Sequence, residues 1–245
     1  MNVALNVIIP DKILPKQAPR KVLWLLHGAA GDHTDWGRKT SVERYANDAG
    51  LCVVMPSAHM SLYRDMAHGG AFFTYIADEL PKLMRRFFGF SESRADNFVC
   101  GLSMGGAGAL RIALHRPEQY AAAACFSAGL SNYLKGQEDY PEFVRLAQLA
   151  FGDESPSGEM AQLQALARDL VAKGAKLPRL YHRCGTEDFL LGCARETRDF
   201  FLSLNKNPFG YVYEEGPGAH TWDYWDEGVR KFIAAIGEDD GGSQK

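Results

Sequence analysis

Residues 97–110, Asn-Phe-Val-Cys-Gly-Leu-Ser-Met-Gly-Gly-Ala-Gly-Ala-Leu, combine a short apolar run, a serine between glycines and a run of small residues. The stretch from Gly101 to Gly105 fits the pattern G-x-S-x-G, which marks a sharp turn from a strand into a helix. Small residues on both sides of the serine permit a turn so tight that the serine backbone is strained. The pattern therefore predicts that the Ser103 hydroxyl stands above a sheet, at a helix N-terminus that stabilises negative charge.

On both sides of this segment, short apolar runs alternate with longer amphipathic ones, which is typical of a mostly parallel sheet covered by helices. Most of the short runs are continuously apolar, as buried parallel strands are. The expected strands are 3–9, 22–26, 52–55, 98–100, 121–126, 180–184 and 210–213. The expected helices, with apolar residues three and four apart, are 42–49, 71–88, 104–115, 160–172, 194–204 and 222–236.

Three segments depart from this regular alternation. The first expected strand precedes Pro10 and Pro15, which favours an antiparallel place at the edge of the sheet. Pro81 lies inside the expected helix 71–88, and we expect it to kink that helix or to mark its restart. Within 130–177 the alternation stops, so we expect a small excursion over the carboxyl edge of the sheet, where ligands bind in such folds.

A serine hydroxyl becomes a good nucleophile only when a base removes its proton, so a histidine must lie within hydrogen-bond reach. Chains with this turn carry the three groups in the order Ser, then Asp or Glu, then His. Three histidines follow Ser103. His115 falls about three turns along an expected helix, and His182 falls inside an expected strand. His220 lies in a glycine-rich loop before the last expected helix and is the predicted base.

The acid that orients the base should end a strand between Ser103 and His220. The run Arg183-Cys-Gly-Thr-Glu-Asp188 does so and offers two adjacent carboxylates, Glu187 and Asp188. A carboxylate on the far side of the imidazole fixes its tautomer and stabilises the imidazolium. We predict Asp188 in this role, with Glu187 as the alternative.

An oxyanion hole needs two backbone N–H groups aimed at the oxygen that becomes negative. One comes from the residue after the nucleophile, here Met104, and the other from a loop after an early strand. The strand expected at 22–26 runs into His27-Gly28-Ala29, so Ala29 is the predicted second donor. Gly28 would let the backbone approach the substrate, and we expect His27 to hold this loop rather than to react.

The composition is that of a soluble globular protein: 245 residues, 46% hydrophobic and 23% charged. No linker divides the chain, so we expect one domain over 1–245. With 27 basic and 30 acidic residues the net charge is −3, which favours a small neutral substrate over nucleic acid or an anionic membrane. No signal peptide, membrane span or metal-ligand spacing is evident, and five cysteines are expected to be buried thiols in a reducing cytoplasm.

Five stretches of the chain resemble the tributyrin esterase family, relatives of feruloyl esterases and of esterase D, which is S-formylglutathione hydrolase. They are LLHGAAGDHTDW (25–36), ERYANDAGLCVVMPS (43–57), DNFVCGLSMGGAGALRIALHRPEQYAAAACFSAGL (96–130), CGTEDFLL (184–191) and GAHTWDYWDEGVRKF (218–232). The resemblance implies an α/β-hydrolase fold and a hydrolase of short-chain acyl esters that needs no cofactor. It also implies Ser103, Asp188 and His220 as a catalytic triad, with Ala29 and Met104 as oxyanion donors.

The natural substrate stays open at this point. The family often has a larger residue where Ala29 and Ala30 stand, which implies a wider or differently shaped acyl pocket. We expect the pocket to be shaped by side chains of 129–178 and 57–70. Alternatives to a carboxylesterase are an acyltransferase similar to the mycolyltransferases, an enzyme acting on S-formylglutathione or feruloyl esters, and a binding module that kept the fold. A homo-oligomer is also left open.

Overall fold

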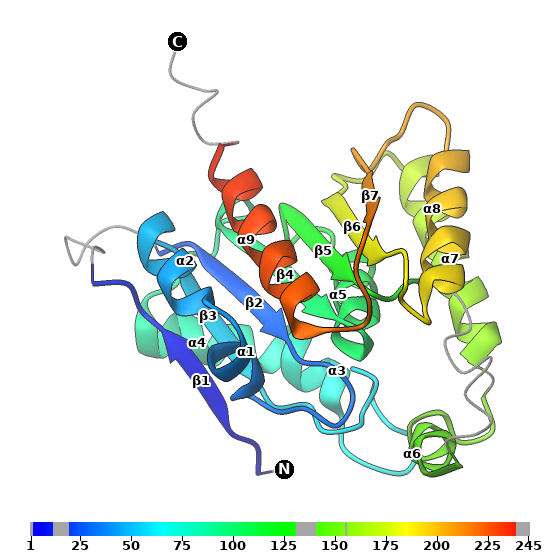
Figure 1. The fold of residues 1–245 in the computed structure, drawn as a ribbon, viewed down its shortest axis with the longest axis horizontal. Helices are drawn as coiled ribbons and strands as arrows, with labels where there is room; N and C mark the ends of the chain where they lie inside the picture. Colours follow the sequence, from blue (N-terminus) through cyan, green and yellow to red (C-terminus); the bar gives the residue numbers. More distant parts are fainter. Residues whose placement is uncertain (1, 12–19, 131–140, 155, 239–245) are drawn as a thin grey trace.

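The computed structural model describes residues 2–11, 20–130, 141–154 and 156–238. Within them one seven-stranded sheet has the order β1-β3-β2-β4-β5-β6-β7 (Figure 1). The strands are β1 (Leu5–Ile8), β2 (Val22–Leu26), β3 (Cys52–Pro56), β4 (Asn97–Leu102), β5 (Ala122–Phe126), β6 (Arg179–Gly185) and β7 (Val212–Gly216). Strand β1 pairs antiparallel with β3, and all the other pairs are parallel. The expected mostly parallel sheet with an antiparallel edge strand is confirmed.

Helices cover both faces of this sheet. Strands β2 to β5 are buried along their whole length, and alternate residues of β2 enter two different core clusters. Continuous burial explains their continuous apolar sequence. The cluster on one face includes side chains of α1 (Asp35–Lys39), α2 (Val42–Ala49) and α9 (Trp222–Glu238). The cluster on the other includes α3 (Phe72–Thr74), α4 (Leu80–Phe88), α5 (Met104–His115), α6 (Pro141–Phe151), α7 (Pro156–Ala172) and α8 (Leu191–Ser203).

The helix expected at 71–88 is divided just before its proline. A π-helical turn, η1 (Tyr75–Glu79), separates α3 from α4, and the Leu80 N–H donates to the Tyr75 carbonyl. Pro81 then stands in the first turn of α4, where its missing N–H leaves no intrahelical bond unmade. The expected restart at Pro81 is therefore confirmed.

Several elements differ from the expectation. Helices α1 and α6 and the 3₁₀ turn η2 (Arg94–Asp96) were not expected. Helix α1 has five residues, too few for a periodic pattern to show. Strand β7 begins at Val212 and continues beyond the expected end at 213. The apolar pattern stopped short because the second half of the strand carries Glu214 and Glu215. These carboxylates suit a strand at the sheet edge, where they pair with Lys231 and Arg195.

The expected break in the alternation after β5 is present. Helices α6 and α7 lie between β5 and β6, and residues 131–140 and 155 fall outside the described part. Helix α7 packs against α5, so it thickens the helical layer on that face of the sheet. Helix α6 lies beside the loop after β3, where the N–H of Ala67 donates to the Ala150 carbonyl at 3.0 Å.

Candidate active site

Ser103 stands between β4 and α5 in a backbone conformation that side chains rarely adopt, with φ 51° and ψ −122°. The flanking glycines make this turn sterically feasible. A Cβ on Gly101 would lie 2.3 Å from the Gly105 carbonyl oxygen, and a Cβ on Gly105 would lie 2.5 Å from the His27 carbonyl oxygen. The turn is fixed further by the Ser103 N–H, which donates to the Phe126 carbonyl at 2.8 Å. The sharp strand-to-helix turn expected from the sequence is present.

Asp188 and His220 are brought together by the loops after β6 and β7. The Nδ1 of His220 lies 3.0 Å and 2.9 Å from the two carboxylate oxygens of Asp188. The Asp188 side chain is fully buried, whereas Glu187 is exposed to solvent. Of the two adjacent carboxylates, the structure therefore brings Asp188 to the imidazole and leaves Glu187 outside.

The environment of Asp188 keeps its carboxyl group ionised. Burial raises the pKa of Asp188, but the hydrogen bond and the charge of His220 lower it. Hydrogen bonds from Ser127 and from the Leu190 N–H, the latter at 2.8 Å, lower the pKa of this carboxyl further. The net result is a pKa below the ordinary value for aspartate, so the group accepts the Nδ1 proton of His220.

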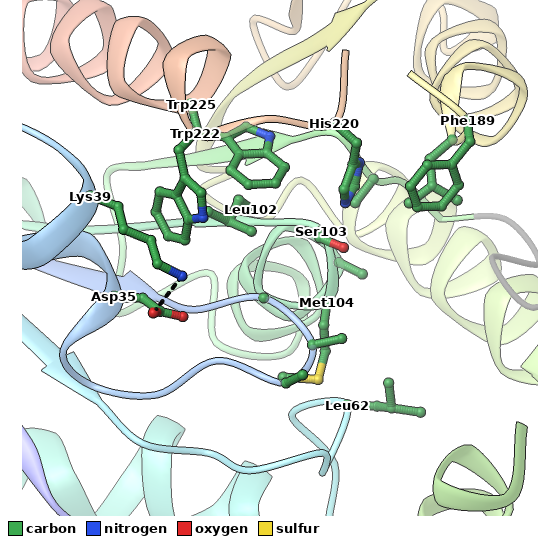
Figure 2. Close-up of a pocket in the computed structure, with 16 residues that line it drawn as sticks. Asp35, Lys39, Leu62, Leu102, Ser103, Met104, Phe189, His220, Trp222 and Trp225 are labelled. Atoms are coloured by element: carbon green, nitrogen blue, oxygen red, sulfur yellow. Dashed lines mark ion pairs between the residues drawn. The ribbon is translucent and has the colours of Figure 1, made fainter. Parts of the chain in front are cut away.

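The His220 ring is held between aromatic neighbours with its other nitrogen toward the cavity. Its centroid lies 4.4 Å from that of Phe189 and 4.9 Å from that of Trp225. Figure 2 shows the imidazole pointing from its loop toward the Ser103 hydroxyl. Ser103 and His220 line the same cavity without a hydrogen bond between them among the described residues. Catalytic hydrogen bonds of this kind often shorten only when substrate binds.

The loop after β2 is built around a different histidine. The Nδ1–H of His27 donates to the Gly28 carbonyl at 2.7 Å, and its Nε2 accepts the Ala58 N–H at 2.8 Å. The Tyr63 hydroxyl donates to the His27 carbonyl at 3.0 Å. Burial lowers the pKa of His27, so the ring stays neutral with both nitrogens in use. The geometry agrees with the expectation that this histidine holds the loop.

Ala29 and Met104 both line the cavity that contains the Ser103 side chain. Neither backbone N–H donates to another backbone group of the described residues. For Met104 this follows from its place as the first residue of α5, where helical N–H groups have no intrahelical acceptor. Both groups are therefore available to a ligand in the cavity.

The cavity has a volume of about 490 Å³, and its wall is mostly apolar. Beside the residues already named, its wall contains Asp35, Lys39, Leu62, Leu102, Ala107, Ala128, Leu190 and Trp222. The expectation that 129–178 shapes the pocket is wrong for the described residues, since none of α6 or α7 reaches the wall. These helices pack on α5 and on the loop after β3 instead. Of 57–70, Leu62 alone contributes.

The wall side chains that sequence reasoning did not single out include Asp35, Lys39, Phe189 and Trp222. Phe189 and Trp222 stand next to Asp188 and close to His220 along the chain, which is a signal that could have found them. Asp35 and Lys39 are spaced by four residues, but that pattern is common on solvent-exposed helices.

The two remaining candidate histidines lie away from Ser103. His182 is 2% exposed; its Nε2–H donates to the Ala128 carbonyl at 2.8 Å and its Nδ1 accepts the Tyr211 hydroxyl at 2.7 Å. Burial lowers the pKa of His182 to about 4. His115 ends α5 against the ring of Phe73. Neither histidine lines the cavity.

The described part of the chain also bears on metal binding, thiol chemistry and membrane insertion. No group of three or more metal-ligating side chains is found there. All five cysteines, which are Cys52, Cys100, Cys125, Cys184 and Cys193, are buried and form no disulfide in this part of the chain. None of the helices seen combines the length and apolar character that crossing a membrane requires.

Comparison with known proteins agrees with this geometry. The sequence model of the Esterase family matches residues 1–235. An acetyl esterase of Caldicellulosiruptor saccharolyticus is 31% identical over 239 residues, which cover 92% of this chain and 86% of that protein. The structure of FphF, a fluorophosphonate-binding serine hydrolase of Staphylococcus aureus, superposes with a TM-score of 0.85 at 32% identity, covering 95% of this chain and 91% of FphF.

The S-formylglutathione hydrolase FrmB of Staphylococcus aureus superposes with a TM-score of 0.77 at 31% identity, covering 96% of this chain and 92% of FrmB. A ferulic acid esterase at 20% identity, with a TM-score of 0.74, supports the fold alone. The sheet, the strained serine turn and these similarities agree. The chain therefore belongs to the Esterase family and is a serine hydrolase of carboxylic esters with the α/β-hydrolase fold.

Proposed function

We propose that this protein hydrolyses short-chain acyl esters through an acyl-enzyme formed on Ser103. His220 takes the proton of the Ser103 hydroxyl, and Asp188 holds the imidazole in the tautomer that can accept it. The N–H groups of Ala29 and Met104 stabilise the oxyanion of each tetrahedral intermediate. His220 then gives its proton to the leaving alcohol, and water repeats the attack on the acyl-enzyme.

The observation that carries this proposal is the pairing of the buried Asp188 carboxylate with His220, whose ring lines the same cavity as the strained Ser103. A carboxylate that stays ionised on the Nδ1 side leaves the Nε2 side of the ring to act as a base. Two residues whose N–H groups have no backbone acceptor in the described part of the chain, Ala29 and Met104, line the same cavity. A binding module would have no need for a base with its acid and two such N–H groups at the cavity that Ser103 lines.

Substrate size is argued from the cavity and from the relatives. An apolar wall excludes water around a small acyl group, and the C. saccharolyticus relative is an acetyl esterase. We therefore expect acetyl to butyryl esters to be turned over best. The FrmB relative favours thioester hydrolysis as a second candidate activity.

The test is labelling combined with an acyl-chain series. An organophosphonate should modify the wild type at Ser103 alone, and Ser103→Ala should lower kcat by about 10⁴-fold or more while the fold persists. p-Nitrophenyl esters from acetate to decanoate, run beside S-formylglutathione and a feruloyl ester, then rank the substrates. An adduct on another serine would remove the proposal, and a maximum at long chains would remove its short-chain part.

A further inference from the structure

One end of the cavity differs chemically from the rest of its wall. Asp35 and Lys39, both from α1, form an ion pair with the Lys39 Nζ at 2.8 Å from the Asp35 Oδ1. The same Nζ lies 4.8 Å from the ring centroid of Trp222, the first residue of α9. Figure 2 shows these three side chains together on the opposite side of His220 from Phe189. All three line the cavity.

Aromatic contacts hold this end in place. The Trp222 ring packs edge-on against Trp36 at 5.4 Å and against Trp225 at 5.1 Å. Trp225 in turn contacts the His220 ring. The ion pair is therefore linked to the proposed base by a continuous row of rings. This arrangement fixes the Trp222 face relative to the reacting groups.

Helix stability does not account for the two charges. A pair four residues apart on a helix contributes only a few tenths of a kcal/mol. The Asp35 carboxylate also requires glycine at position 31, because a Cβ on Gly31 would lie 2.3 Å from the Asp35 Oδ2. The loop that carries Ala29 thus leaves room for this carboxylate at the cavity wall. A charged pair there loses solvation whenever an apolar substrate enters.

The balance of charge indicates what would compensate that loss. The pair is neutral as a whole, so a substrate ion of either sign would compete with the partner already present. A hydroxyl group can donate to the Asp35 carboxylate and accept from the Lys39 ammonium in the same place. The apolar face of Trp222 can pack on the carbon atoms that carry such hydroxyls.

We propose that Asp35, Lys39 and Trp222 form a hydroxyl-binding subsite, and that the enzyme prefers esters of hydroxylated, polyol-like molecules. This inference rests on the proposed function, because it assigns a substrate class to the same cavity. It predicts that hydroxylated esters are favoured over apolar esters of equal size, and that the preference appears mainly in KM.

The experiment uses two matched pairs of esters. Glyceryl monoacetate against propyl acetate places hydroxyls in the alcohol half, and ethyl 3-hydroxybutyrate against ethyl butyrate places one in the acyl half. In the wild type we expect the hydroxylated member of at least one pair to have the higher kcat/KM. Lys39→Met and Asp35→Asn should each lower that ratio about tenfold, as the loss of a charged hydrogen bond would. Lys82→Met, an exposed lysine of α4 outside the cavity, is the matched control.

The outcomes separate this inference from the proposed function. If the wild type shows no preference in either pair, or if the variants lower both members equally, the subsite is wrong while Ser103 chemistry stands. The preference of the wild type within each ester pair is measured without any variant. This comparison therefore tests the subsite even if a variant fails to fold. If Ser103→Ala keeps turning over all four esters, the proposed function fails instead.

Discussion

Two loops near Ser103 each carry a histidine, and the two histidines have opposite roles. In the loop after β2, His27 is 1% exposed and both of its ring nitrogens are bonded to backbone groups. In the loop after β7, the His220 side chain is 18% exposed, and the protein hydrogen bonds of its ring run through Nδ1 to Asp188. A ring with both nitrogens in use cannot accept a proton without losing a hydrogen bond, so it acts as scaffold. A ring with one nitrogen open can act as a base.

The largest expected effect on the proposed catalytic histidine comes from changing Asp188, the hydrogen-bond partner of His220. Asp188→Asn keeps the shape of the side chain but reverses its hydrogen-bonding preference, which favours the wrong His220 tautomer. We expect kcat to fall by a factor on the order of 10⁴. Steady-state kinetics on a good ester substrate gives the number.

The adjacent exposed carboxylate gives the matched control. Glu187→Gln should change kcat far less, because its side chain points to solvent. Thermal unfolding of both variants shows whether they are equally folded. If Glu187→Gln is the more damaging at equal stability, the assignment of the acid is wrong.

His182 is a second structural histidine, because both of its ring nitrogens are hydrogen-bonded, as they are in His27. Its pKa is lowered to about 4 in the fold, against about 6.5 for histidine in an unfolded chain. Between these values the unfolded state binds the extra proton, so stability falls as the pH falls from 6.5 to 4. The loss attributable to this group is up to about 3 kcal/mol.

Urea unfolding at several pH values measures this loss, and His182→Gln separates it from the titration of carboxylates. The variant should be less stable near neutral pH but should lose less on acidification than the wild type. Parallel curves for the two proteins would show that the fold does not lower the pKa of His182.

The smallest expected effect concerns the support of the first loop. Tyr63→Phe removes the hydrogen bond to the His27 carbonyl and so loosens the segment that carries the Ala29 N–H. We expect kcat to fall about tenfold, equivalent to about 1.4 kcal/mol, with KM nearly unchanged. A loss in KM alone would contradict a role in positioning the oxyanion donor.

Tyr45→Phe is the control for this variant. It removes a hydroxyl that donates to Asp226 at 2.9 Å, between α2 and α9, and Tyr45 does not line the cavity. The two variants lose the same atom and one hydrogen bond each. Equal kinetic losses would mean that Tyr63 acts through stability alone.

Much of this molecule could be predicted from the sequence because its decisive residues are constrained locally. The Ser103 turn needs its glycines, and buried parallel strands need continuous apolar runs, so both leave a clear pattern. The mostly parallel sheet was predicted on these grounds, the family resemblance implied the α/β-hydrolase fold, and both are confirmed. The triad and oxyanion roles stay predictions, although the structure brings four of those residues to one cavity and places Asp188 against the His220 ring.

The parts of the cavity that could not be predicted from the sequence depend on contacts between segments far apart in the chain. Lys39 reaches the cavity only because α1 packs beside the start of α9, and no local pattern reports that contact. The expectation that 129–178 shapes the pocket was wrong for the described helices, since none of their residues lines the cavity and α7 buries its apolar side chains against α5. An amphipathic stretch predicts that a helix packs on something, but not on what.

The backbone of Ser103 also bears on how such a chain can evolve. A left-handed conformation at a residue with a Cβ costs on the order of 1–3 kcal/mol, which is a large share of the 5–15 kcal/mol that holds a typical domain folded. Glycine would adopt the same φ without that penalty, yet it has no hydroxyl. Selection for heat resistance alone would therefore favour the loss of the nucleophile. Serine persists at such a position only while its chemistry is itself under selection. Position 103 is therefore a site where stability and catalytic activity favour different residues.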